Sequence, residues 1–363
     1  MKKNKNYVDL KDQPVPEGQH LLEVDDLKMY FHTEDGVVRA VDGVSYTLDR
    51  GETLGVVGES GSGKSVTAMT IMGLISMPPG KIEGGDVRYR GRSILEMTEE
   101  EMQHIRGNDI AMIFQDPMTS LNPVYKIGKQ VGEGLRLHRG YSKQEALKRA
   151  TELLDLVGIP EPEKRVNEYP HQFSGGMRQR VMIAMALACD PDILIADEPT
   201  TALDVTIQAQ IIELMQEMQE KNGNAIIMIT HDLGVVADMA DKIMVMYAGR
   251  PVEFGTAEEI FYESRHPYTW GLIRSIPEQA IEEKKPLTPI HGNPPSLMKL
   301  PEGCVFSPRC PYATDKCRKQ RPERVVTESG HYSACHYSGD PEFLKNAPET
   351  SRTRKDSKKG GEA

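Results

Sequence analysis

The stretch "TLGVVGESGSGKSVTAMTIMGL", residues 53–74, decides the fold of this chain. It opens with "TLGVV", a short apolar run of the kind that forms a buried strand. Residues 58–65, "GESGSGKS", fit the pattern G-x-x-x-x-G-K-[ST] of a phosphate-binding loop. The apolar segment that follows has the composition of a helix, which completes the strand–loop–helix context that the motif requires. A chance match is the alternative, and this context argues against it.

The residue types in the loop suit a nucleoside phosphate. Glycines let the backbone fold so that successive N–H groups point at phosphate oxygens, and the start of the helix adds its positive dipole end. Lys64 is expected to neutralise the β and γ phosphates, and Ser65 to ligate Mg²⁺. The expected ATP-binding residues of the loop are Ser60, Gly61, Gly63, Lys64, Ser65 and Val66.

A second element, "ILIADEPTTALD" (residues 193–204), is a buried strand that ends in two carboxylates, Asp197 and Glu198. Open α/β sheets bind their ligands at the carboxyl ends of their strands. Asp197 suits the Mg²⁺ shell, and Glu198 is placed to polarise an attacking water as a general base. The alternative, a pair of solvated turn residues, is weakened by the presence of the loop.

Apolar runs that suit buried strands alternate with helical patterns. In "EALKRATELLDLVGIP" the apolar residues fall on one helical face, and Gly158 and Pro160 end the helix. Strands that alternate with helices predict an α/β fold with much parallel pairing. The expected strands are residues 21–31, 37–48, 53–58, 110–114, 193–197, 225–230 and 242–249.

Composition limits where the protein works. The 363 residues include 44 basic and 54 acidic side chains, a net charge of −10. This balance argues against general nucleic-acid binding, which usually needs a basic face. The early lysines precede no apolar run, so no secretory signal is expected, and no stretch approaches the ~20 apolar residues of a membrane span. We expect a soluble, cytosolic protein that reaches a membrane only through a partner.

The stretch "FSGGMRQRVMIAMALA", together with the two motifs above, resembles the signature of ATP-binding-cassette (ABC) ATPases, usually Leu-Ser-Gly-Gly-Gln. The order of the elements also matches: phosphate loop, "FQDP", signature, paired acids, "ALD" and "THD". This chain departs from the consensus at Phe173 and Met177 but keeps the Ser–Gly–Gly core. The resemblance implies a RecA-like α/β core, an antiparallel β-subdomain and a helical subdomain.

The resemblance also implies roles for single residues. Gln115 would touch Mg²⁺ and the attacking water, and His231 would contact the γ-phosphate and hold Glu198. Phe31, with Tyr30 as the second choice, would stack on adenine. Two cassettes would sandwich two ATP molecules head to tail. The residues implied to face the partner cassette are Ser174, Gly175 and Gly176 of the signature and Asp204 of the dimer interface.

Longer strings, including "IAMIFQDPMTSLNPVY" and "RHPYTWGL", are similar to the cassettes of bacterial dipeptide and oligopeptide importers. The likeness implies an ATPase subunit on the cytoplasmic face of the cell membrane. Its partners would be a second, related cassette, two membrane permease subunits and, indirectly, an extracytoplasmic peptide-binding protein. Nickel and oligosaccharide importers are alternatives, because the cassette does not contact cargo. A soluble cassette acting in DNA repair or translation is the rival class, but such chains often carry two cassettes or a coiled-coil insertion, both absent here.

With the resemblance, the chain divides into four parts. We expect a flexible arm over residues 1–20 and the nucleotide-binding domain over 21–275, with its helical subdomain at about 116–185. Residues 276–340 form a Pro- and Cys-rich extension without periodicity, which is expected to be a small irregular module. Residues 341–363 are charged, with few apolar residues, and are expected to be a disordered tail.

Four of the five cysteines gather in that extension: Cys304, Cys310, Cys317 and Cys335. In a reducing compartment such a cluster favours metal ligands over disulfides. Structural zinc sites usually show two close C-x₂₋₄-C pairs, which are absent, whereas a [4Fe–4S] cluster tolerates wider spacing. Spacing leaves a [4Fe–4S] cluster, zinc and unligated thiols open; the likeness to the importer subunits favours the cluster. Cys189 is expected to be a buried small residue.

Overall fold

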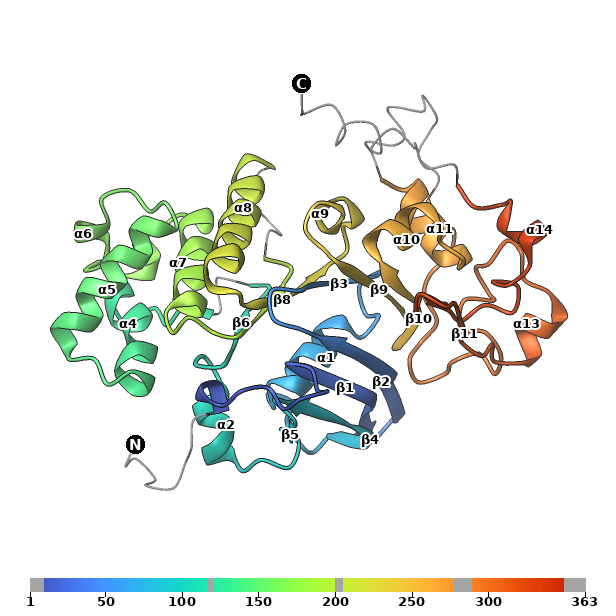
Figure 1. Ribbon diagram of the computed structural model, residues 1–363, viewed down its shortest axis with the longest axis horizontal. Coiled ribbons are helices and arrows are strands. Elements are labelled where there is room, and N and C mark those ends of the chain that lie inside the picture. The colour runs from blue at the N-terminus through green and yellow to red at the C-terminus, as the bar shows by residue number, and fades with distance from the viewer. Residues whose placement is uncertain (1–9, 117–119, 200–204, 277–288, 349–363) are drawn as a thin grey trace.

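The computed structural model describes residues 10–116, 120–199, 205–276 and 289–348, and it places them around two β-sheets (Figure 1). The strands are β1 (Leu22–Thr33), β2 (Gly36–Leu48), β3 (Thr53–Val57), β4 (Gly80–Tyr89), β5 (Arg92–Ser93), β6 (Ile110–Ile113), β7 (Ile193–Asp197), β8 (Ala225–Thr230), β9 (Lys242–Tyr247), β10 (Arg250–Thr256), β11 (Val325–Val326) and β12 (Tyr332–Ser333).

The helices are α1 (Lys64–Ile71), α2 (Glu99–Ile105), α4 (Ile127–His138), α5 (Lys143–Leu156), α6 (Pro162–Arg165), α7 (Gly175–Leu187), α8 (Val205–Asn222), α9 (Leu233–Ala237), α10 (Ala257–Tyr262), α11 (Pro267–Arg274), α13 (Asp315–Lys319) and α14 (Pro341–Leu344), with 3₁₀ turns η1 (Leu10–Asp12) and η2 (Pro170–Gln172). Among the described residues, no helix is both long enough and apolar enough to cross a membrane.

The larger sheet has the strand order β11-β12-β10-β9-β3-β8-β7-β6. Strands β9, β3, β8, β7 and β6 pair in parallel, and β10 joins β9 antiparallel. The strands β3, β6, β7 and β8 are buried at every residue, as their unbroken apolar runs predict. Their carboxyl ends meet along one edge of the sheet, and this edge receives the loops that carry the predicted site.

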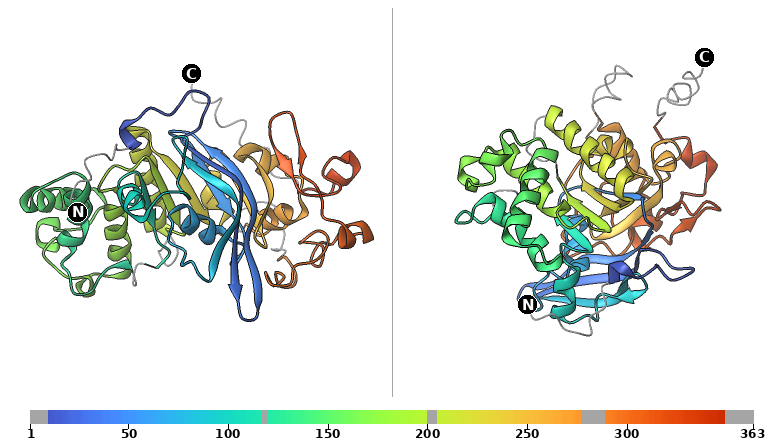
Figure 2. Two further views of the ribbon diagram at one scale, coloured as in Figure 1. Left: turned by 90° about the horizontal axis from the view of Figure 1, so that it is seen from below. Right: turned by 60° about the vertical axis from the view of Figure 1, so that its left-hand side comes forward.

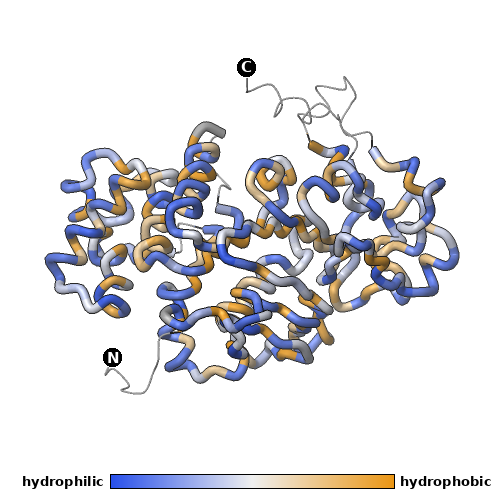
Figure 3. The backbone as a smooth tube through the Cα atoms, viewed as in Figure 1, coloured by the Kyte–Doolittle hydropathy of each residue, from blue (hydrophilic) through white to orange (hydrophobic). Residues whose placement is uncertain are grey.

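Alternate residues of each parallel strand feed two separate cores. In β7, Ile193 and Ile195 join the core shared with α1 and the smaller sheet. Leu194 and Ala196 point the other way, into the core shared with α4, α5, α7 and α8. Figure 3 shows orange, hydrophobic stretches along the central strands in the middle of the molecule. Because side chains alternate between the two faces of a strand, the same parallel strands pack against both cores, one on each face of the sheet.

The smaller sheet is antiparallel, with the order β2-β1-β4-β5. Its β1–β2 hairpin projects beyond the rest of the fold, and helices α4 to α7 gather at the end of the molecule opposite the C-terminal extension (Figure 2). Helix α5 begins at a capping box, in which Ser142 and Glu145 each accept the other's backbone N–H. The predicted α/β fold with an added antiparallel sheet is confirmed.

Three expectations about the ends of the chain need correction. The flexible arm is wrong for residues 10–20, because Leu10 is buried and Lys11 donates to the backbone carbonyl of Cys189 at 3.1 Å. The disordered tail is wrong for residues 341–348, because the ring of Phe343 packs against Trp270 at 5.3 Å. The extension is also less irregular than expected, because β12 adds to the edge of the large sheet beside β10. Residues 1–9 and 349–363 lie outside the described residues.

Candidate active site

The loop between β3 and α1 requires glycine at two positions. Gly58 has φ +152° and Gly63 has φ +100°, which residues with a side chain rarely adopt. A Cβ on Gly58 would lie 2.2 Å from the carbonyl oxygen of Met246 in β9. A Cβ on Gly63 would lie 2.3 Å from that of Ala40 in β2. The loop is therefore closely packed between the two sheets, and its neighbours fix its shape.

The middle of the loop is exposed, whereas Gly58 and Gly63 at its two ends are closely packed. Ser60 and Gly61 are exposed, and nothing lies within 4 Å of a Cβ built on Gly61. Ser65 and Val66, in the first turn of α1, are partly buried. Backbone N–H groups at the start of a helix leave a positive dipole end facing outward. The predicted ATP-binding residues therefore line a surface that an anion can approach.

Lys64 begins α1 and reaches back across the loop. Its Nζ donates to the carbonyl oxygens of Gly58 at 2.6 Å and Glu59 at 3.1 Å. Burial lowers the pKa of Lys64, while the carboxylates of Glu198 and Asp197 act in the opposite direction. A buried cation that donates to carbonyl oxygens of the loop is suited to exchange them for phosphate oxygens.

Ser65 and Asp197 join the loop to the end of β7. The Ser65 hydroxyl donates to Oδ1 of Asp197 at 2.9 Å. Burial raises the pKa of Asp197, and the charge of Glu198 adds to this effect, while Ser65 and Lys64 oppose it. A hydroxyl beside a buried carboxylate offers the oxygen ligands that Mg²⁺ prefers, and a divalent cation would favour the charged carboxylate. These two residues fit the predicted magnesium site.

The three residues predicted to be catalytic lie together, and Glu198 contacts the other two, Gln115 and His231. The backbone of Glu198 has φ +47°, a left-handed conformation that is strained for a residue with a side chain, and its N–H donates to Ile229 O at 2.9 Å. Its Oε2 accepts from Nε2 of Gln115 at 2.9 Å, and its Oε1 lies 3.3 Å from Nδ1 of His231. Gln115 follows β6 and His231 follows β8, so three neighbouring strand ends deliver this group.

The two candidates for adenine stacking have different surroundings. The hydroxyl of Tyr30 donates to Asp42 at 2.9 Å, and Asp42 also accepts from Arg250 at 2.8 Å. Phe31 has no hydroxyl to anchor and packs, half-buried, at the edge of the smaller core. Tyr30 is thus already engaged by the protein, which favours Phe31 as the aromatic that remains available to a ligand.

The predicted signature residues form an exposed helix N-terminus. Ser174 is the N-cap of α7 and accepts from the backbone N–H of Met177 at 3.3 Å. Ser174 and Gly175 are exposed, and Gly176 is half-buried. Nothing lies within 4 Å of a Cβ built on Gly175, so the surface there is open. Asp204, the predicted interface residue, lies outside the described residues.

The four clustered cysteines line one small cavity in the extension. The residues around it are His266, Pro267, Cys304, Phe306, Ser307, Cys310, Tyr312, Cys317, Cys335, His336, Tyr337 and Phe343. Burial raises the pKa of the Cys304 thiol, and the backbone of Phe306 acts in the opposite direction. The backbones of Tyr312 and Tyr337 oppose the same effect of burial at Cys310 and Cys335. The fourth sulfur, of Cys317, lies 3.5 Å from the hydroxyl of Thr314.

The thiols converge, but their present arrangement is not that of a metal site. Within the part of the chain that the structure describes, no group of three or more His, Cys, Asp or Glu side chains has the arrangement to hold a metal ion. Burial raises the pKa of Cys310 to about 11 and that of Cys335 to about 12, and the neighbouring thiols act in the same direction. Burial disfavours thiolates, so a metal would have to supply the compensating charge.

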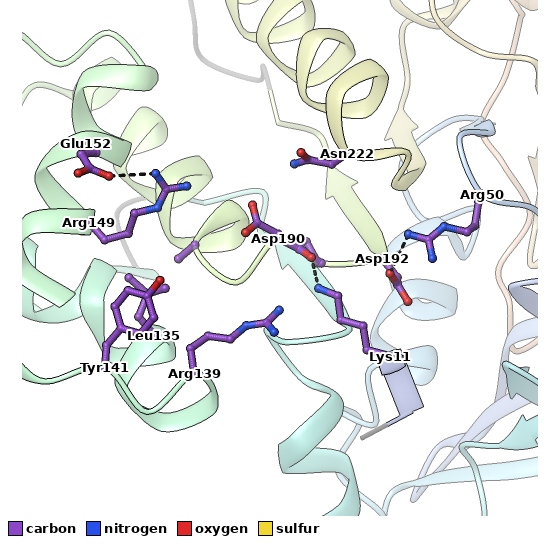
Figure 4. A pocket seen from close by; sticks show the side chains of 12 residues that line it. Lys11, Arg50, Leu135, Arg139, Tyr141, Arg149, Glu152, Asp190, Asp192 and Asn222 are labelled. Atoms are coloured by element: carbon purple, nitrogen blue, oxygen red, sulfur yellow. Dashed lines mark hydrogen bonds and ion pairs between the residues drawn. The ribbon is translucent and has the colours of Figure 1, made fainter. Parts of the chain in front are cut away.

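A larger cavity of about 700 Å³ lies away from the phosphate loop (Figure 4). Lys11 of η1 and Arg139, which follows α4, both donate to the carbonyl oxygen of Cys189, at 3.1 and 2.6 Å. Cys189 follows the end of α7, so the two cations stabilise the negative end of that helix. At this cavity the N-terminal segment therefore contacts the end of α7 and the residues that lead from it into β7. Cys189 is buried there, as expected.

Two residues that hold the phosphate loop were not identified from the sequence. Tyr268 and Arg309 both contact Glu59, from 209 and 250 positions further along the chain. A short-range motif cannot indicate contacts at such separations, and an arginine beside a cysteine carries no signal of its own.

Two families match parts of the chain. The "ABC transporter" family matches residues 41–201, and the family described as "Oligopeptide/dipeptide transporter, C-terminal region" matches residues 252–317. The first match contains the phosphate loop, the signature and the paired acids. The second covers most of the connection from β10 to Cys317.

Curated relatives are similar over most of the chain. The "Oligopeptide transport ATP-binding protein OppD" of Bacillus subtilis (strain 168) is 58% identical over 312 residues, 86% of this chain and 87% of the relative. The "Dipeptide transport ATP-binding protein DppD" of Escherichia coli (strain K12) is 52% identical over 320 residues, 88% of this chain and 97% of the relative.

Solved structures are similar over the cassette. A dimeric, post-hydrolysis state of the ATP-binding cassette MJ0796 bound to ADP and Pi has a TM-score of 0.59 at 29% identity. The similarity covers 65% of this chain and 98% of that one.

Proposed function

Because the chain belongs to the ABC transporter family, we propose that it hydrolyses ATP at the loop between β3 and α1 and that the hydrolysis drives uptake of di- or oligopeptides. The observation that carries the site is the convergence of the loop, Asp197, Glu198, Gln115 and His231 at one edge of the sheet. Peptides are favoured as cargo because the C-terminal match and the relatives described above are all peptide-transport proteins by name. A nickel or oligosaccharide importer is the alternative.

The roles of the residues follow from their contacts. Lys64 exchanges its loop carbonyls for the β and γ phosphates, and the backbone N–H groups of the loop bind the same oxygens. Ser65, Asp197 and Gln115 would hold Mg²⁺, which would offset the negative charge of the phosphates. Glu198 accepts a proton from the attacking water, and His231 keeps its carboxylate oriented. The water oxygen bonds to the γ phosphorus, the bond from that phosphorus to the β–γ bridging oxygen breaks, and ADP and inorganic phosphate are released without a covalent intermediate on the protein.

The active site requires a second cassette. Ser174, Gly175 and Gly176 expose a helix N-terminus in which Gly175 has no neighbour on its open side, and such an end binds anions. We propose that it faces the γ-phosphate held by the partner cassette, a related but different chain, with Asp204 at the interface. Two separate permease subunits would anchor the pair at the cytoplasmic face of the cell membrane.

Reconstitution tests the proposal. The full chain is purified with its companion cassette and permease subunits, and ATP hydrolysis and uptake of labelled peptide into vesicles are measured. Lys64→Ala is expected to abolish both. Lys81→Ala, at an exposed lysine paired with Glu83 at 3.1 Å, is the matched control and should change neither. Uptake that persists in Lys64→Ala would rule out this site, and a complex that hydrolyses ATP but moves nickel or oligosaccharide would correct the cargo.

We also propose the division of the chain into a cassette over residues 21–275, with its helical subdomain at about 116–185, and an extension over 276–340. The packed helices α4 to α7 and the distinct thiol cavity support these boundaries.

For the extension we propose that Cys304, Cys310, Cys317 and Cys335 hold a [4Fe–4S] cluster, with zinc as the alternative. Their common cavity supports this, because the four thiolates that hold such a cluster must converge on one site. The group would cross-link a segment with little core of its own. Anaerobic purification should give absorbance near ~400 nm and about four irons per chain. Zinc without iron would reject the cluster, and a metal-free protein would reject both.

A further inference from the structure

A partly buried ion pair joins the C-terminal extension to the phosphate loop. The guanidinium of Arg309 donates to both carboxylate oxygens of Glu59, from Nη1 at 2.6 Å and from Nη2 at 3.0 Å. The Arg309 side chain is only 4% exposed. Glu59 is the second residue of the phosphate-binding motif, so the contact reaches the loop itself across 250 positions of sequence. Bidentate pairs of this kind fix orientation as well as distance.

The remaining donors of Arg309 are also occupied. Its Nε donates to the carbonyl oxygen of His291 at 2.9 Å, and Nη2 donates to that of Ile290 at 3.1 Å. Nη1 lies 3.3 Å from the hydroxyl of Tyr247 at the end of β9. The guanidinium of Arg309 therefore has hydrogen-bond partners on both sides, in the extension and in the phosphate loop. A change of its rotamer would leave a buried charge unpaired.

Glu59, whose side chain Arg309 fixes, also contacts residues of the loop that are expected to bind phosphate. Its carbonyl oxygen accepts from the backbone N–H of Ser62 at 3.2 Å and from Nζ of Lys64 at 3.1 Å. Its own N–H donates to the hydroxyl of Tyr268 at 2.9 Å. Both the side chain and the backbone of Glu59 are thus anchored from outside the loop, and the anchored backbone in turn holds the turn of the loop and the position of Lys64.

The turn that carries Arg309 also carries two of the clustered thiols. The N–H groups of Arg309 and Cys310 both donate to the carbonyl oxygen of Phe306 at 3.0 Å. The N–H of Ser307 donates to the carbonyl oxygen of Cys304 at 3.0 Å, and the ring of Phe306 lies 5.4 Å from that of Tyr268. A single turn of backbone therefore contacts the thiol cavity on one side and presents Arg309 to the phosphate loop on the other.

We propose that Arg309 is a positioning residue for nucleotide binding and that it couples the thiol turn of the extension to the phosphate loop. This proposal rests on the proposed ATP site. Arg309 does not touch the nucleotide: it fixes Glu59, and Glu59 fixes Lys64 and the loop backbone. Release of the extension from the loop lowers affinity for ATP while the catalytic group at Glu198 stays in place.

The test compares Arg309→Met, Arg309→Lys and Glu59→Gln in the complete transporter. Arg309→Met is expected to raise KM for ATP about tenfold to a hundredfold, since small displacements of positioning groups cost this much. The value of kcat should stay within about threefold, because Glu198 is untouched. Arg309→Lys should recover only part of the loss, because one ammonium cannot replace two parallel N–H bonds. In the double variant Arg309→Met with Glu59→Gln, KM should be no higher than in the worse single variant.

Two controls keep the result interpretable. Arg318→Met removes a solvent-exposed pair with Asp315 in the same extension and should leave KM unchanged. Cys310→Ala should raise KM in the same direction as Arg309→Met, whereas Cys189→Ala, at the buried thiol outside the extension, should not. Direct titration of the purified full chain with fluorescent ATP checks the same order of affinities without turnover.

Each outcome bears on the proposal. If Arg309→Met folds with an unchanged melting temperature and keeps the wild-type KM, the positioning role is overturned. If it lowers the melting temperature but leaves KM unchanged, Arg309 is structural only, and the proposal fails. If Cys310→Ala behaves like Cys189→Ala, the coupling to the thiol turn is refuted. A wild-type chain that does not bind ATP, or binding that survives Lys64→Ala, would instead contradict the proposed ATP site.

Discussion

Replacement of Glu198 by Gln is the sharpest test of the chemistry at this site. The two side chains have the same shape, and the amide oxygen of Gln can still accept the Gln115 N–H that now lies 2.9 Å from Oε2 of Glu198. The substitution removes the charge and the proton acceptor while it keeps the packing of a side chain that is only 13% exposed. The Glu198→Gln variant should therefore still bind ATP but should lose the proton transfer from the attacking water.

The expected loss follows from the role of a general base. Positioned acids and bases contribute about 10²- to 10⁴-fold to rate. At about 1.4 kcal/mol per factor of ten, this corresponds to about 3–5 kcal/mol of activation free energy. Affinity for ATP should be unchanged or higher, because Glu198 places a negative charge close to Lys64 and Asp197, where the phosphates would bind.

The assay measures single-turnover hydrolysis and equilibrium ATP binding on the same preparation of the assembled transporter. Glu213→Gln, at an exposed position on α8, is the matched control and should retain full activity. Size-exclusion chromatography with ATP should show the two cassettes remaining associated in Glu198→Gln. Turnover within tenfold of the wild type would refute the assignment of Glu198, and loss of ATP binding would mean that the carboxylate acts in binding rather than in proton transfer.

Three further predictions concern single side chains. His231→Ala removes a contact to Oε1 of Glu198, at 3.3 Å, and should lower kcat about tenfold to a hundredfold with a smaller change in ATP affinity, as steady-state kinetics would show. Burial lowers the pKa of His266 to about 3, so the folded state stays neutral while the unfolded state gains a proton below pH 6.5. The free energy of unfolding of His266→Asn should therefore fall less steeply between pH 6.5 and 4.5, by about 1.4 kcal/mol per pH unit in urea titrations; parallel curves would contradict this. Phe343→Ala removes ring contacts to Trp270 at 5.3 Å and Tyr337 at 5.4 Å. It should lower the free energy of unfolding by about 1–2 kcal/mol. An unchanged midpoint in a urea titration would show that these contacts contribute nothing to stability.

The parallel strands and the site at their ends were predictable, because each depends on a short sequence signal. The run "ILIAD" is buried at every residue in β7, and Gly58 and Gly63 of the phosphate loop stand where a Cβ has no room. The strands β4 and β10 were not predicted, because their buried and exposed residues do not form an unbroken apolar run. Their positions depend on pairing with β1 and β9.

The ends of the chain were harder to predict for a different reason. A single leucine in a polar segment gives no periodic signal, yet Leu10 is buried. Similarly, Phe343 stands in a stretch that composition indicates to be disordered, and its packing depends on Trp270, 73 positions earlier in the chain. Long-range contacts of individual side chains decide these regions, and composition averages over them.

The contacts at the phosphate loop divide into two kinds. The bonds of Lys64 to Gly58 and Glu59, and of Ser65 to Asp197, join groups that ATP and Mg²⁺ would engage, so binding exchanges these bonds for others of similar strength. The net affinity is then a small difference that depends on how well the loop is already arranged. The pair between Arg309 and Glu59 is of the other kind, because no step of binding or hydrolysis needs to break it. It can therefore set the affinity of the site while it takes no part in the reaction.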